Sequence, residues 1–498
     1  MKLKFLCDAA GIDCPARYAD LTIDSIESDS RYVQAGALFV CIRGLHTDGH
    51  TYIADACAAG AVCILAEADA LIGEETKIPI LRVLNTRRAI SYLYHAWYGF
   101  PTKHLKMIGV TGTNGKTSVT HMLRAILEAS FYRCGLIGTV GCESAGRHLD
   151  TRGHNPAANM TTPDPETLYR LLSQMVDDGV EYVLMEVTSH ALALEKLAPI
   201  RFEAAIFTNL TPEHLDFHGT MTAYAEAKSA LFSASKLSVL NFDSPYSAYM
   251  REKATGKVIT CSQFRAADYR AEGVRADESG VEYRLRSGRA DMRIQCPIPG
   301  GFSVINSMQA ACCALELGIS APRVQDALAS LIGVRGRMER VKLGFDADFT
   351  VLIDYAHTPD ALENLLRTAA ELRDPRGRTV LLFGCGGDRD KGKRPMMGKI
   401  ASSNADFVIV TSDNSRSEDP QQIIDEICAG MDTRENSVVI VDRADAIRYA
   451  IRNARPGDLI LLAGKGHEEY EITREGRCAF SEKKLVREAF AERTRAKD

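Results

Sequence analysis

Gly109-Val-Thr-Gly-Thr-Asn-Gly-Lys-Thr-Ser118 joins an apolar run, residues 105–110, to a segment with helical periodicity. The pattern predicts a strand, a glycine-rich loop and a helix, in that order. Hydrophobic residues recur in the last segment at a spacing that gives a helix one apolar face. These residues are Val119, Met122, Leu123, Ile126 and Leu127. The amino-terminal end of the helix is therefore expected to point at the loop.

The chemistry of this loop suits a nucleoside triphosphate. A helix start offers unpaired N–H groups and partial positive charge, and Gly112 and Gly115 let the backbone approach a phosphate closely. Lys116 adds a cation, and Thr117 can hold Mg²⁺. Val110 stands where the common G-x4-G-K-[ST] pattern has its first glycine, so the loop alone could be a glycine-rich turn with a surface lysine. The flanking strand and helix favour the triphosphate site.

The composition of the 498-residue chain indicates a multidomain globular protein. Two to four domains are expected, because one hydrophobic core does not extend over so long a chain. With 46% hydrophobic and 25% charged residues, the disordered and fibrous classes are excluded. The net charge of −5 argues against nucleic-acid or membrane partners that bind through bulk positive charge.

The fourteen cysteines show no Cys-x-x-Cys pair and no Cys/His cluster at zinc spacing. No signal peptide or membrane span is visible in the sequence. We therefore expect a reduced, cytoplasmic protein whose cysteines mostly fill its cores. The expected oligomeric state is a monomer.

Three α/β domains are predicted, at residues 1–100, 101–332 and 333–498. The first contains two polar segments, Ser28-Asp-Ser-Arg31 and Gly44-Leu-His-Thr-Asp-Gly49, which could be mere turns because Ser, Asp and Gly favour turns. Its expected strands lie at residues 37–42, 61–66 and 80–83, and its expected helices near residues 52–59 and 86–97.

In the second domain two further apolar strands, residues 182–185 and 204–207, lead into polar segments. Glu186 ends the first strand. A carboxylate at the tip of a strand beside a phosphate loop can hold the Mg²⁺ that bridges ATP phosphates, or it can simply lie in solvent. The second strand precedes His214, Asp216 and His218, which could bind a metal or cap turns.

Lys228 is expected to face the protein interior, because Tyr224, Lys228 and Leu231 fall at i, i+4 and i+7 on one helical stripe. A buried ammonium is costly, so it must be neutralised, paired or chemically converted. Carbamylation by CO2 would turn it into an oxygen ligand. From spacing alone, the preferred interpretation is a lysine whose ammonium extends to water.

The rest of the chain gives two patterns. Residues 257–299 alternate polar and apolar positions, which suggests an antiparallel insertion, and a helix at about residues 305–317 follows. From residue 333, strands alternate with helical stretches, which predicts a doubly wound parallel sheet. Ligands of such sheets bind beyond the carboxyl ends of the strands. The expected strands are residues 350–354, 379–383, 407–411, 438–441 and 459–462.

A set of short motifs extends from the first domain to the last. They are Ser28-Asp-Ser-Arg31, Gly112-Thr-Asn-Gly-Lys-Thr117, Thr161-Thr162, Glu186-Val-Thr-Ser-His190, Thr208-Asn209, His214-Leu-Asp-Phe-His-Gly219, Tyr224, Ala227-Lys228, Gly336-Arg-Met-Glu339, Asp354-Tyr-Ala-His357, Pro359, residues 384–395, Asp413-Asn-Ser-Arg416 and Gly464-Lys-Gly-His467. Together they resemble the Mur ligases, the ATP-dependent amino-acid ligases of peptidoglycan synthesis. The resemblance covers nearly the whole chain and implies that the three domains hold a UDP-linked substrate, ATP with Mg²⁺, and the incoming amino acid.

The resemblance also implies roles for individual residues. ATP would contact Gly112, Thr113, Asn114, Gly115, Lys116, Thr117, Ser118, Asn306 and Arg337. The catalytic residues would be Lys116, Lys228, Glu186 and His214. The Mg²⁺ ligands would be Thr117, Glu186, His214 and Lys228 in its carbamylated form, which for Lys228 reverses the preference from spacing alone.

The UDP-N-acetylmuramoyl dipeptide would contact a third set of residues, Ser28, Ser30, Leu45, His46, Thr47, Thr161, Thr162, Thr188 and Lys196. Two departures from the family pattern fall in or beside this set. Lys196 stands where the family usually has Arg, and would hold an anion as a point charge rather than a fork. Leu194 replaces a glutamine found in some members.

The amino-acid acceptor would contact Arg389, Asp413, Asn414, Ser415, Arg416, Gly464 and Glu468. The segment Asp413-Asn-Ser-Arg416 resembles the D-N-P-R motif of the members that add meso-diaminopimelate, with Ser415 in place of Pro. That acceptor has a second carboxylate and ammonium, so its pocket needs a cation and an anion, which Arg416 with Arg389 and Glu468 supply. L-lysine lacks the far carboxylate and is disfavoured.

The expected reaction transfers the γ-phosphoryl group of ATP to the γ-carboxylate of the D-glutamate end, after which the acceptor amine attacks the acyl phosphate. Closure of the third domain onto the second would align the substrates and exclude water. Rival enzymes of the same architecture are the D-alanyl-D-alanine-adding ligase and folylpolyglutamate synthetase. From other classes, a P-loop ATPase or kinase, or a nucleotide-binding regulator without ligase activity, remains an alternative.

Overall fold

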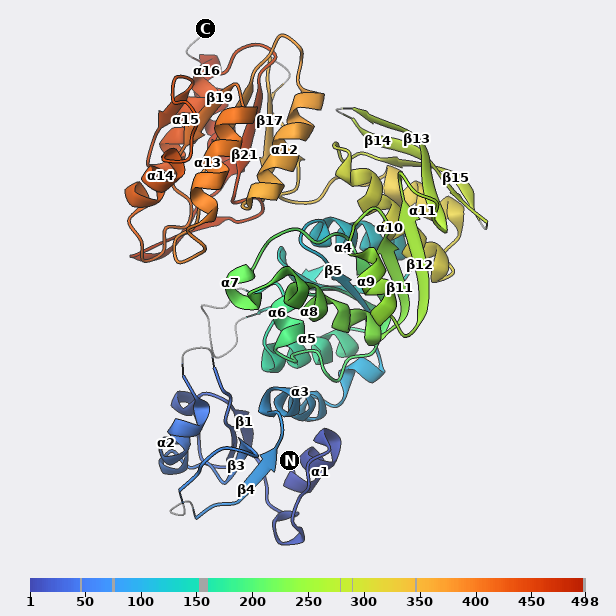
Figure 1. Cartoon of the computed structure of the whole chain (residues 1–498), viewed down its shortest axis with the longest axis vertical. Coiled ribbons are helices and arrows are strands. Elements are labelled where there is room, and N and C mark those ends of the chain that lie inside the picture. Colours follow the sequence, from blue (N-terminus) through green and yellow to red (C-terminus); the bar gives the residue numbers. More distant parts are fainter. Residues whose placement is uncertain are drawn as a thin grey trace.

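The computed structural model shows an elongated molecule in which three β-sheets follow one another along the long axis (Figure 1). It describes residues 1–44, 47–73, 77–151, 160–277, 279–288, 290–344 and 347–495. The first sheet is parallel, with the order β1-β2-β3-β4. Its strands are β1 (Ser25–Glu27), β2 (Ala37–Val40), β3 (Cys63–Glu67) and β4 (Ile80–Val83).

Helices α1 (Leu3–Ala10) and α3 (Thr86–Trp97) share a buried core with one face of the first sheet, and α2 (Ile53–Ala58) packs on the other face. The predicted strands and helices of this segment are thus confirmed to within a few residues. Because α3 also packs on α5 (Pro165–Asp177), the cores of the first and second sheets are continuous. The predicted substrate residues Leu45 and His46 lie outside the described residues.

The second sheet has the order β15-β14-β13-β12-β11-β10-β5-β9-β6-β7-β8. Its parallel centre consists of β6 (Cys134–Gly138), β9 (Tyr182–Glu186), β5 (Lys106–Thr111), β10 (Phe202–Phe207), β11 (Ser235–Asn241) and β12 (Lys257–Ser262). The outer strands on one side are β7 (Gly141–Ser144) and β8 (Arg147–His148), and those on the other are β13 (Tyr269–Asp277), β14 (Gly280–Ser287) and β15 (Asp291–Cys296).

The prediction of an antiparallel insertion over residues 257–299 is correct only from β13 onward. Strand β12 pairs in parallel with β11 and so belongs to the central sheet, and β13 also begins in parallel with β12. The antiparallel pairs are β13 with β14 and β14 with β15. Alternation of polar and apolar residues reports one solvated face, and it does not by itself give strand direction.

Helices cover both faces of the second sheet. On one face the buried cluster contains α4 (Lys116–Ala129), α10 (Phe302–Glu316) and α11 (Ala321–Ala329). On the other it contains α5, α6 (Ser189–Ala193), α8 (Met221–Ser233) and α9 (Ser247–Lys253). The short helix α7 (Leu215–His218) lies in the loop before α8. Strand β5, the loop and α4 confirm the predicted strand–loop–helix unit.

The third sheet has the order β16-β17-β21-β18-β19-β20, and all pairs except β16 with β17 are parallel. Its strands are β16 (Glu339–Arg340), β17 (Thr350–Asp354), β21 (Leu459–Ala463), β18 (Thr379–Phe383), β19 (Phe407–Val410) and β20 (Ser437–Val439). Helices α12 (Pro359–Leu372), α13 (Lys393–Asn404) and α14 (Pro420–Cys428) cover one face, and α15 (Arg443–Arg452) and α16 (Glu482–Arg495) the other.

The predicted doubly wound sheet is thereby confirmed, and two features were not expected from the sequence. One is the antiparallel edge strand β16. The other is a separate hairpin of β22 (Tyr470–Thr473) and β23 (Gly476–Ala479), whose residues lie beside the polar loop after β19. Short 3₁₀ turns occur at Ala16–Tyr18, Ser30–Tyr32, Gly49–Tyr52 and Pro101–Lys103.

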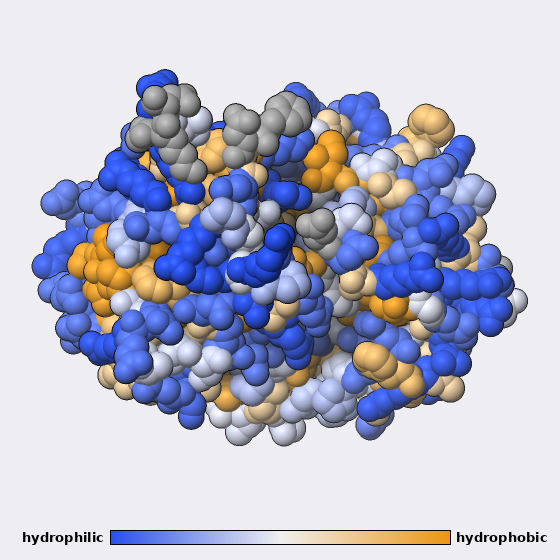
Figure 2. Space-filling model, turned by 90° about the horizontal axis from the view of Figure 1, so that it is seen from above, coloured by the Kyte–Doolittle hydropathy of each residue, from blue (hydrophilic) through white to orange (hydrophobic). Residues whose placement is uncertain are grey.

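The face of the protein that is seen from above is mainly polar. Seen from above, hydrophobic residues form separate small groups among hydrophilic ones (Figure 2). Among the described residues, the helices are too short or too polar to cross a membrane.

The third domain is stabilised by a buried ion pair between α15 and α16. Arg443 and Glu482 are both nearly inaccessible to solvent, and Nε of Arg443 lies 2.9 Å from Oε1 of Glu482. Arg443 also donates to the carbonyl of Ser412, just after β19, and to that of Ala463, at the end of β21. The pair therefore fixes the helices relative to the edge of the sheet that carries polar loops.

Arg443→Met leaves the Glu482 carboxylate buried without its partner, so we expect the free energy of unfolding to fall by about 3–5 kcal/mol. Urea unfolding followed by circular dichroism measures the change. The control is Arg448→Met, which removes a more exposed arginine paired with Asp445 and should cost about 0–1 kcal/mol. Equal small losses for both variants would contradict the proposed importance of the buried pair.

Candidate active site

The glycine-rich loop follows β5, the strand at the centre of the second sheet, and ends where α4 begins at Lys116. Gly112 and Gly115 have φ values of +150° and +85°, which side chains rarely allow. Space also requires glycine at both positions. A Cβ atom at Gly112 would lie 1.9 Å from Oγ1 of Thr208, and one at Gly115 would lie 2.6 Å from Oδ1 of Asn306.

The loop after β10 holds the glycine-rich loop in place. The amide of Asn114 donates to Oδ1 of Asn209 at 2.9 Å, and the amide of Thr113 donates to the Asn209 carbonyl at 3.0 Å. The hydroxyl of Thr208 donates to the Asn114 carbonyl. The backbone of the loop is therefore fixed by neighbouring side chains before any ligand is considered.

Two lysine side chains converge on one carbonyl oxygen of this loop. Nζ of Lys116 and Nζ of Lys228 each lie 3.0 Å from the oxygen of Gly112. Lys228 is only 2% exposed, which confirms that its helical stripe faces inward. The interpretation preferred from spacing alone, an ammonium that extends to water, is wrong. Burial lowers the pKa of Lys228 well below its usual range, and the charge of Lys116 lowers it further. Burial also lowers the pKa of Lys116.

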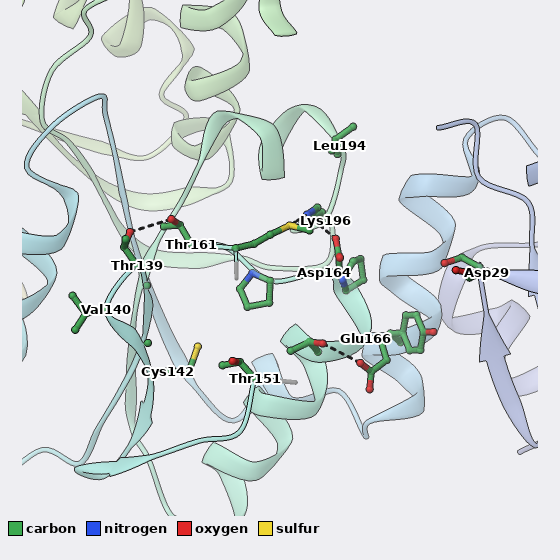
Figure 3. A pocket seen from close by; sticks show the side chains of 18 of the residues that line it. Asp29, Thr139, Val140, Cys142, Thr151, Thr161, Asp164, Glu166, Leu194 and Lys196 are labelled. Atoms are coloured by element: carbon green, nitrogen blue, oxygen red, sulfur yellow. Dashed lines mark hydrogen bonds and ion pairs between the residues drawn. The ribbon is translucent and has the colours of Figure 1, made fainter. Parts of the chain in front are cut away.

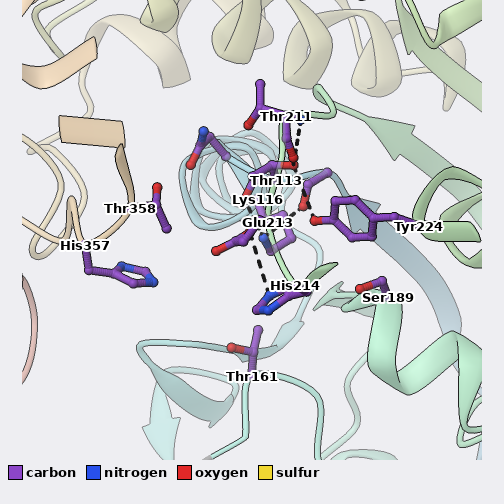
Figure 4. Close-up of polar contacts among 12 residues, drawn as sticks. Thr113, Lys116, Thr161, Ser189, Thr211, Glu213, His214, Tyr224, His357 and Thr358 are labelled. Carbon is purple, nitrogen blue, oxygen red and sulfur yellow. Dashed lines mark hydrogen bonds and ion pairs between the residues drawn. The ribbon is translucent and has the colours of Figure 1, made fainter. Parts of the chain in front are cut away.

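Glu213 is a residue that the sequence reasoning did not select. Burial alone would raise its pKa, but His214, Lys116, His357 and Lys228 in their protonated forms lower it on balance. Its carboxylate lies 3.7 Å from Nε2 of His214. Figure 4 shows Glu213 between Lys116 and His214, with His357 of the third domain facing the group. Its position next to His214, in the loop after an apolar strand, was the available sequence signal.

Glu186 ends β9 beside the glycine-rich loop and is 2% exposed, so the solvent alternative is wrong. Its Oε1 accepts from the hydroxyl of Thr117 at 3.0 Å and from the amide of Thr139 at 2.9 Å, and its Oε2 accepts from the Thr139 hydroxyl at 3.0 Å. Gly138 makes room for the carboxylate, because a Cβ atom there would lie 2.4 Å from Oε1. One carboxylate thus joins β6, β9 and the start of α4.

Arg337 of the third domain contacts the start of α4. Its Nη2 donates to Oγ1 of Thr117 at 3.0 Å, and its guanidinium lies 4.8 Å from the ring centre of Tyr355. Asn306 on α10 lies against Gly115, as described above. Ser118 is buried in the first turn of α4. The predicted ATP residues from the second and third domains therefore lie together.

The predicted metal ligands form an incomplete set. Within the described parts of the chain, no three His, Cys, Asp or Glu side chains are grouped so that they could hold a metal ion. The oxygens of Thr117 and Glu186 suit Mg²⁺, but Lys228 as an ammonium cannot be a ligand. The residues fit the ion only if Lys228 supplies oxygen.

His190 of α6 packs against the histidines of the loop after β10. The rings of His190 and His214 are 4.7 Å apart, and Nε2 of His218 lies 2.9 Å from Oγ of Ser189. Burial lowers the pKa of His190 to about 4 and also lowers those of His214 and His218. These rings are therefore neutral near pH 7.

A cavity of about 550 Å³ is lined by residues of all three domains. Figure 3 shows part of its lining from the first and second domains. Of the residues predicted to hold the UDP-linked substrate, Ser28, Thr161 and Lys196 line it. Thr162 and Thr188 hydrogen-bond each other just behind Thr161, while Ser30 and Thr47 do not line the cavity. Lining residues from the third domain include Tyr355, His467, Glu468 and Tyr470.

Lys196 is the buried cation of this cavity. Its Nζ lies 2.7 Å from Oδ1 of Asp164 and 3.2 Å from Sδ of Met160 (Figure 3). Leu194, the other departure from the family pattern, also lines the cavity. Lys196 is thus already paired with a carboxylate in this structure.

The acceptor residues predicted in the third domain form a connected polar network. Nδ2 of Asn414 donates to Glu468 at 2.7 Å, and Nζ of Lys465 donates to Oδ1 of Asn414 at 2.9 Å. Lys465, which had no predicted role, also lies 3.6 Å from Asp413 and is fully buried. Burial raises the pKa of Glu468, and the charge of Asp413 adds to that. The amide of Gly464 donates to the carbonyl of Asp354 at 3.1 Å.

Two arginines at this edge lack carboxylate partners among the described residues. Arg416 donates to the carbonyls of Gly387 and Asn414, at 2.8 and 3.3 Å, and Arg389 donates to the carbonyl of Asp388 at 3.1 Å. Burial lowers the pKa of Arg389, and the charge of Arg416 lowers it further. Ser415 is buried. The two neighbouring guanidiniums of Arg389 and Arg416 form a site that favours an anion.

Three family models match the chain in order. They are the Mur ligase family, catalytic domain, over residues 22–98; the Mur ligase middle domain, over residues 110–314; and the Mur ligase, glutamate ligase domain, over residues 336–466. The chain belongs to the Mur ligase family. This membership confirms the predicted family, the α/β fold class and the classification as a ligase.

Curated relatives extend over almost the full length of this Mur ligase. A UDP-N-acetylmuramoyl-L-alanyl-D-glutamate--2,6-diaminopimelate ligase of Clostridium botulinum is 40% identical, over 94% of this chain and 95% of its own. The protein of the same name from Caldanaerobacter subterraneus subsp. tengcongensis is 43% identical, over 95% and 96%.

Solved structures agree with the fold. A structure of UDP-N-acetylmuramoyl-L-alanyl-D-glutamate--2,6-diaminopimelate ligase matches with a TM-score of 0.69 and 30% identity, over 99% of this chain and 100% of that one. A MurF ligase from Thermotoga maritima in complex with ADP matches with a TM-score of 0.60, over 96% and 99%. At 18% identity the second match supports the fold alone.

Gly138→Ala tests the position of the Glu186 carboxylate. The new Cβ would lie 2.4 Å from Oε1, so the carboxylate must shift, and we expect ATP-dependent turnover to fall by about 100-fold. Phosphate release measures it. The control is Gly135→Ala on the same strand, where the new Cβ meets the flexible thioether of Met175 at 2.6 Å. Similar turnover in the two variants would contradict the assigned role of Glu186.

Proposed function

We propose that this Mur ligase joins meso-diaminopimelate to the γ-carboxylate of the D-glutamate in UDP-N-acetylmuramoyl-L-alanyl-D-glutamate, with conversion of ATP to ADP and phosphate. The names of relatives that are 40–43% identical over 94–95% of the chain support the substrate and the acceptor. The fold match at 30% identity supports them independently of the pairwise alignments.

The observation that carries the choice of acceptor is the pair of guanidiniums at Arg389 and Arg416, which form no ion pair with a carboxylate of the described chain. Diaminopimelate brings a far carboxylate to these cations and a far ammonium to the anionic side chains of Asp413 and Glu468. L-lysine would leave the arginines unpaired, at a cost of about 1.5–3 kcal/mol for each lost charged hydrogen bond.

In the proposed reaction the glycine-rich loop holds the triphosphate. The N–H groups of the loop and the ammonium of Lys116 stabilise negative charge on the phosphoryl group as it moves to the substrate carboxylate. Asn306 and Arg337 lie where they can contact the same nucleotide from α10 and the third domain. The acceptor amine then attacks the acyl phosphate, an amide bond forms and phosphate leaves.

The cavity between the domains supports the assignment of the UDP-linked substrate. Ser28 lies at its first-domain end and Glu468 at its third-domain end, while Thr161 lies between them, close to Glu186 through Thr139. We propose that Lys196 releases Asp164 and binds a carboxylate or phosphate of this substrate instead. Thr162 and Thr188 then act by holding Thr161 and the end of β9 in place.

We propose that Lys228 is carbamylated and that Thr117, Glu186, His214 and the carbamate hold Mg²⁺. A neutral amine is the form that reacts with CO2, and burial together with Lys116 favours that form of Lys228. Bound Mg²⁺ supplies charge neutralisation for the ATP phosphates. Glu213 partly compensates the positive charge of Lys116.

We further propose a monomer that acts in the cytoplasm. All of the predicted substrate sites come from one chain, so a second copy is not needed to complete them. All fourteen cysteines are free, which suits a reducing compartment.

A second candidate function is the same ligation with L-lysine, because Ser415 replaces the proline of the diaminopimelate motif. To distinguish the two, the protein is supplied with UDP-muramoyl dipeptide, ATP and Mg²⁺, and phosphate release is followed with either amino acid. We expect kcat/KM for meso-diaminopimelate to exceed that for L-lysine by about 10- to 150-fold, from one lost charged hydrogen bond. Phosphate release that depends on lysine, with none from diaminopimelate, would overturn the proposed choice of acceptor.

ATP binding without amide formation from any amino acid would favour a nucleotide-binding regulator.

Arg416→Ala removes one of the two acceptor cations. We expect the KM for diaminopimelate to rise by about 10- to 100-fold, while the KM for ATP stays within about threefold, because only the acceptor loses a partner. Arg376→Ala, an exposed arginine paired with Asp374 on the same domain, is the control and should change neither constant. Equal increases in both KM values for Arg416→Ala would count against its assigned role.

A further inference from the structure

Asp360 links the third domain to the glycine-rich loop of the second. It lies in the first turn of α12, directly after the polar loop that follows β17. Its Oδ2 accepts from Nδ2 of Asn114 at 2.5 Å and from Oγ1 of Thr211 at 3.3 Å. Asn114 belongs to the glycine-rich loop, and Thr211 to the loop after β10. One carboxylate oxygen of the third domain therefore contacts both walls of the nucleotide site.

Stabilisation of α12 alone does not explain this arrangement. An acidic residue in a first turn commonly stabilises its own helix, through the N–H groups or the helix dipole. Here Thr358 already provides the cap, because its hydroxyl accepts from the amide of Ala361. The side-chain hydrogen bonds of Asp360 both cross to the other domain. Burial raises the pKa of this carboxyl, whereas the bonds from Thr211 and Asn114 lower it.

Both partners of Asp360 are rigidly held on the second domain. The backbone of Asn114 is fixed by Thr208 and Asn209, so its amide side chain remains available to project across the boundary. The amide of Thr211 donates to Oγ1 of Thr113 at 3.0 Å. Asp360 therefore meets a preformed surface, and its two bonds require one particular placement of α12.

On its own domain, Asp360 is close to residues that lead to the acceptor site. The loop before α12 contains His357, whose carbonyl accepts from Nζ of Lys393 at 3.0 Å. Lys393 begins α13, the helix that follows the segment containing Arg389. A movement of α12 relative to the glycine-rich loop would therefore move the acceptor residues relative to the phosphoryl group.

We propose that Asp360 is a positioning residue that holds the closed arrangement of the second and third domains, by binding Asn114 and Thr211, and so sets the distance between the acyl phosphate and the acceptor amine. It does not itself contact the reacting atoms. This inference rests on the proposed ligase function for its kinetic test, but its structural test does not.

The kinetic test compares Asp360→Ala with Asp360→Asn and with Glu363→Ala, a matched removal of an exposed carboxylate from the same helix. For Asp360→Ala we expect kcat to fall by about 10- to 100-fold, because small misplacement of reactants has effects of that size. The affinity for a non-hydrolysable ATP analogue, measured by calorimetry, should change less than about threefold, since the loop itself is intact. Asp360→Asn keeps an oxygen acceptor and should recover most of the lost kcat.

Coupling to the partner is tested with Thr211→Val. If the two side chains act through their hydrogen bond, the double variant Asp360→Ala/Thr211→Val should lose less than the product of the two single losses. Independent, multiplicative losses would overturn the proposal. So would a kcat for Asp360→Ala equal to that of Glu363→Ala, or an Asp360→Asn variant as impaired as Asp360→Ala.

The structural test uses small-angle X-ray scattering and needs no acceptor or muramoyl substrate. With the ATP analogue bound, Asp360→Ala is expected to have a larger radius of gyration than the wild-type protein and Glu363→Ala. Equal radii for all three proteins would overturn the positioning role. If the wild-type protein formed no amide with any amino acid, the proposed function would fail, and the scattering comparison would still decide the role of Asp360.

Discussion

Two lysine side chains, the buried Lys228 and the half-buried Lys116, share a carbonyl acceptor, and this constraint organises the active site. The oxygen of Gly112 accepts from both Lys116 and Lys228, each at 3.0 Å. Two ammonium groups so close together repel each other, and burial penalises both charges. The site is therefore stable only if anions approach it or if one lysine gives up its charge. Glu213 supplies part of the compensation, and the phosphates of ATP suit the rest.

The sheets place the other reactants around this pair. Strands β5, β9 and β10 are neighbours, so their carboxyl ends bring together the glycine-rich loop, Glu186 and the loop of Thr208 to His214. The carboxyl ends of β17, β21 and β19 do the same for the acceptor residues. Arg337 and Asp360 cross from the second group to the first. This arrangement favours catalysis by proximity. Each domain holds one substrate, and the contacts between the domains fix the distances between the substrates.

Much of this arrangement could be predicted from local sequence. Three features follow from the spacing of residues along the chain, which can be read from the sequence. They are the glycine-rich loop, the inward-facing helical stripe of Lys228 and the doubly wound third domain. The parallel pairing of β12 could not, because alternation gives the solvated face of a strand and not its direction. The importance of Glu213, Lys465 and Asp360 also escaped prediction, because their partners are distant in sequence and become neighbours only through the tertiary fold.

The most direct test of the central claim is ¹³C nuclear magnetic resonance of the protein equilibrated with ¹³C-labelled bicarbonate. If one of the two lysines gives up its charge by carbamylation, a carbamate signal should appear in the wild-type protein and be absent from Lys228→Ala. A fully active protein that shows no such signal would contradict the claim, as would a signal that persists in Lys228→Ala.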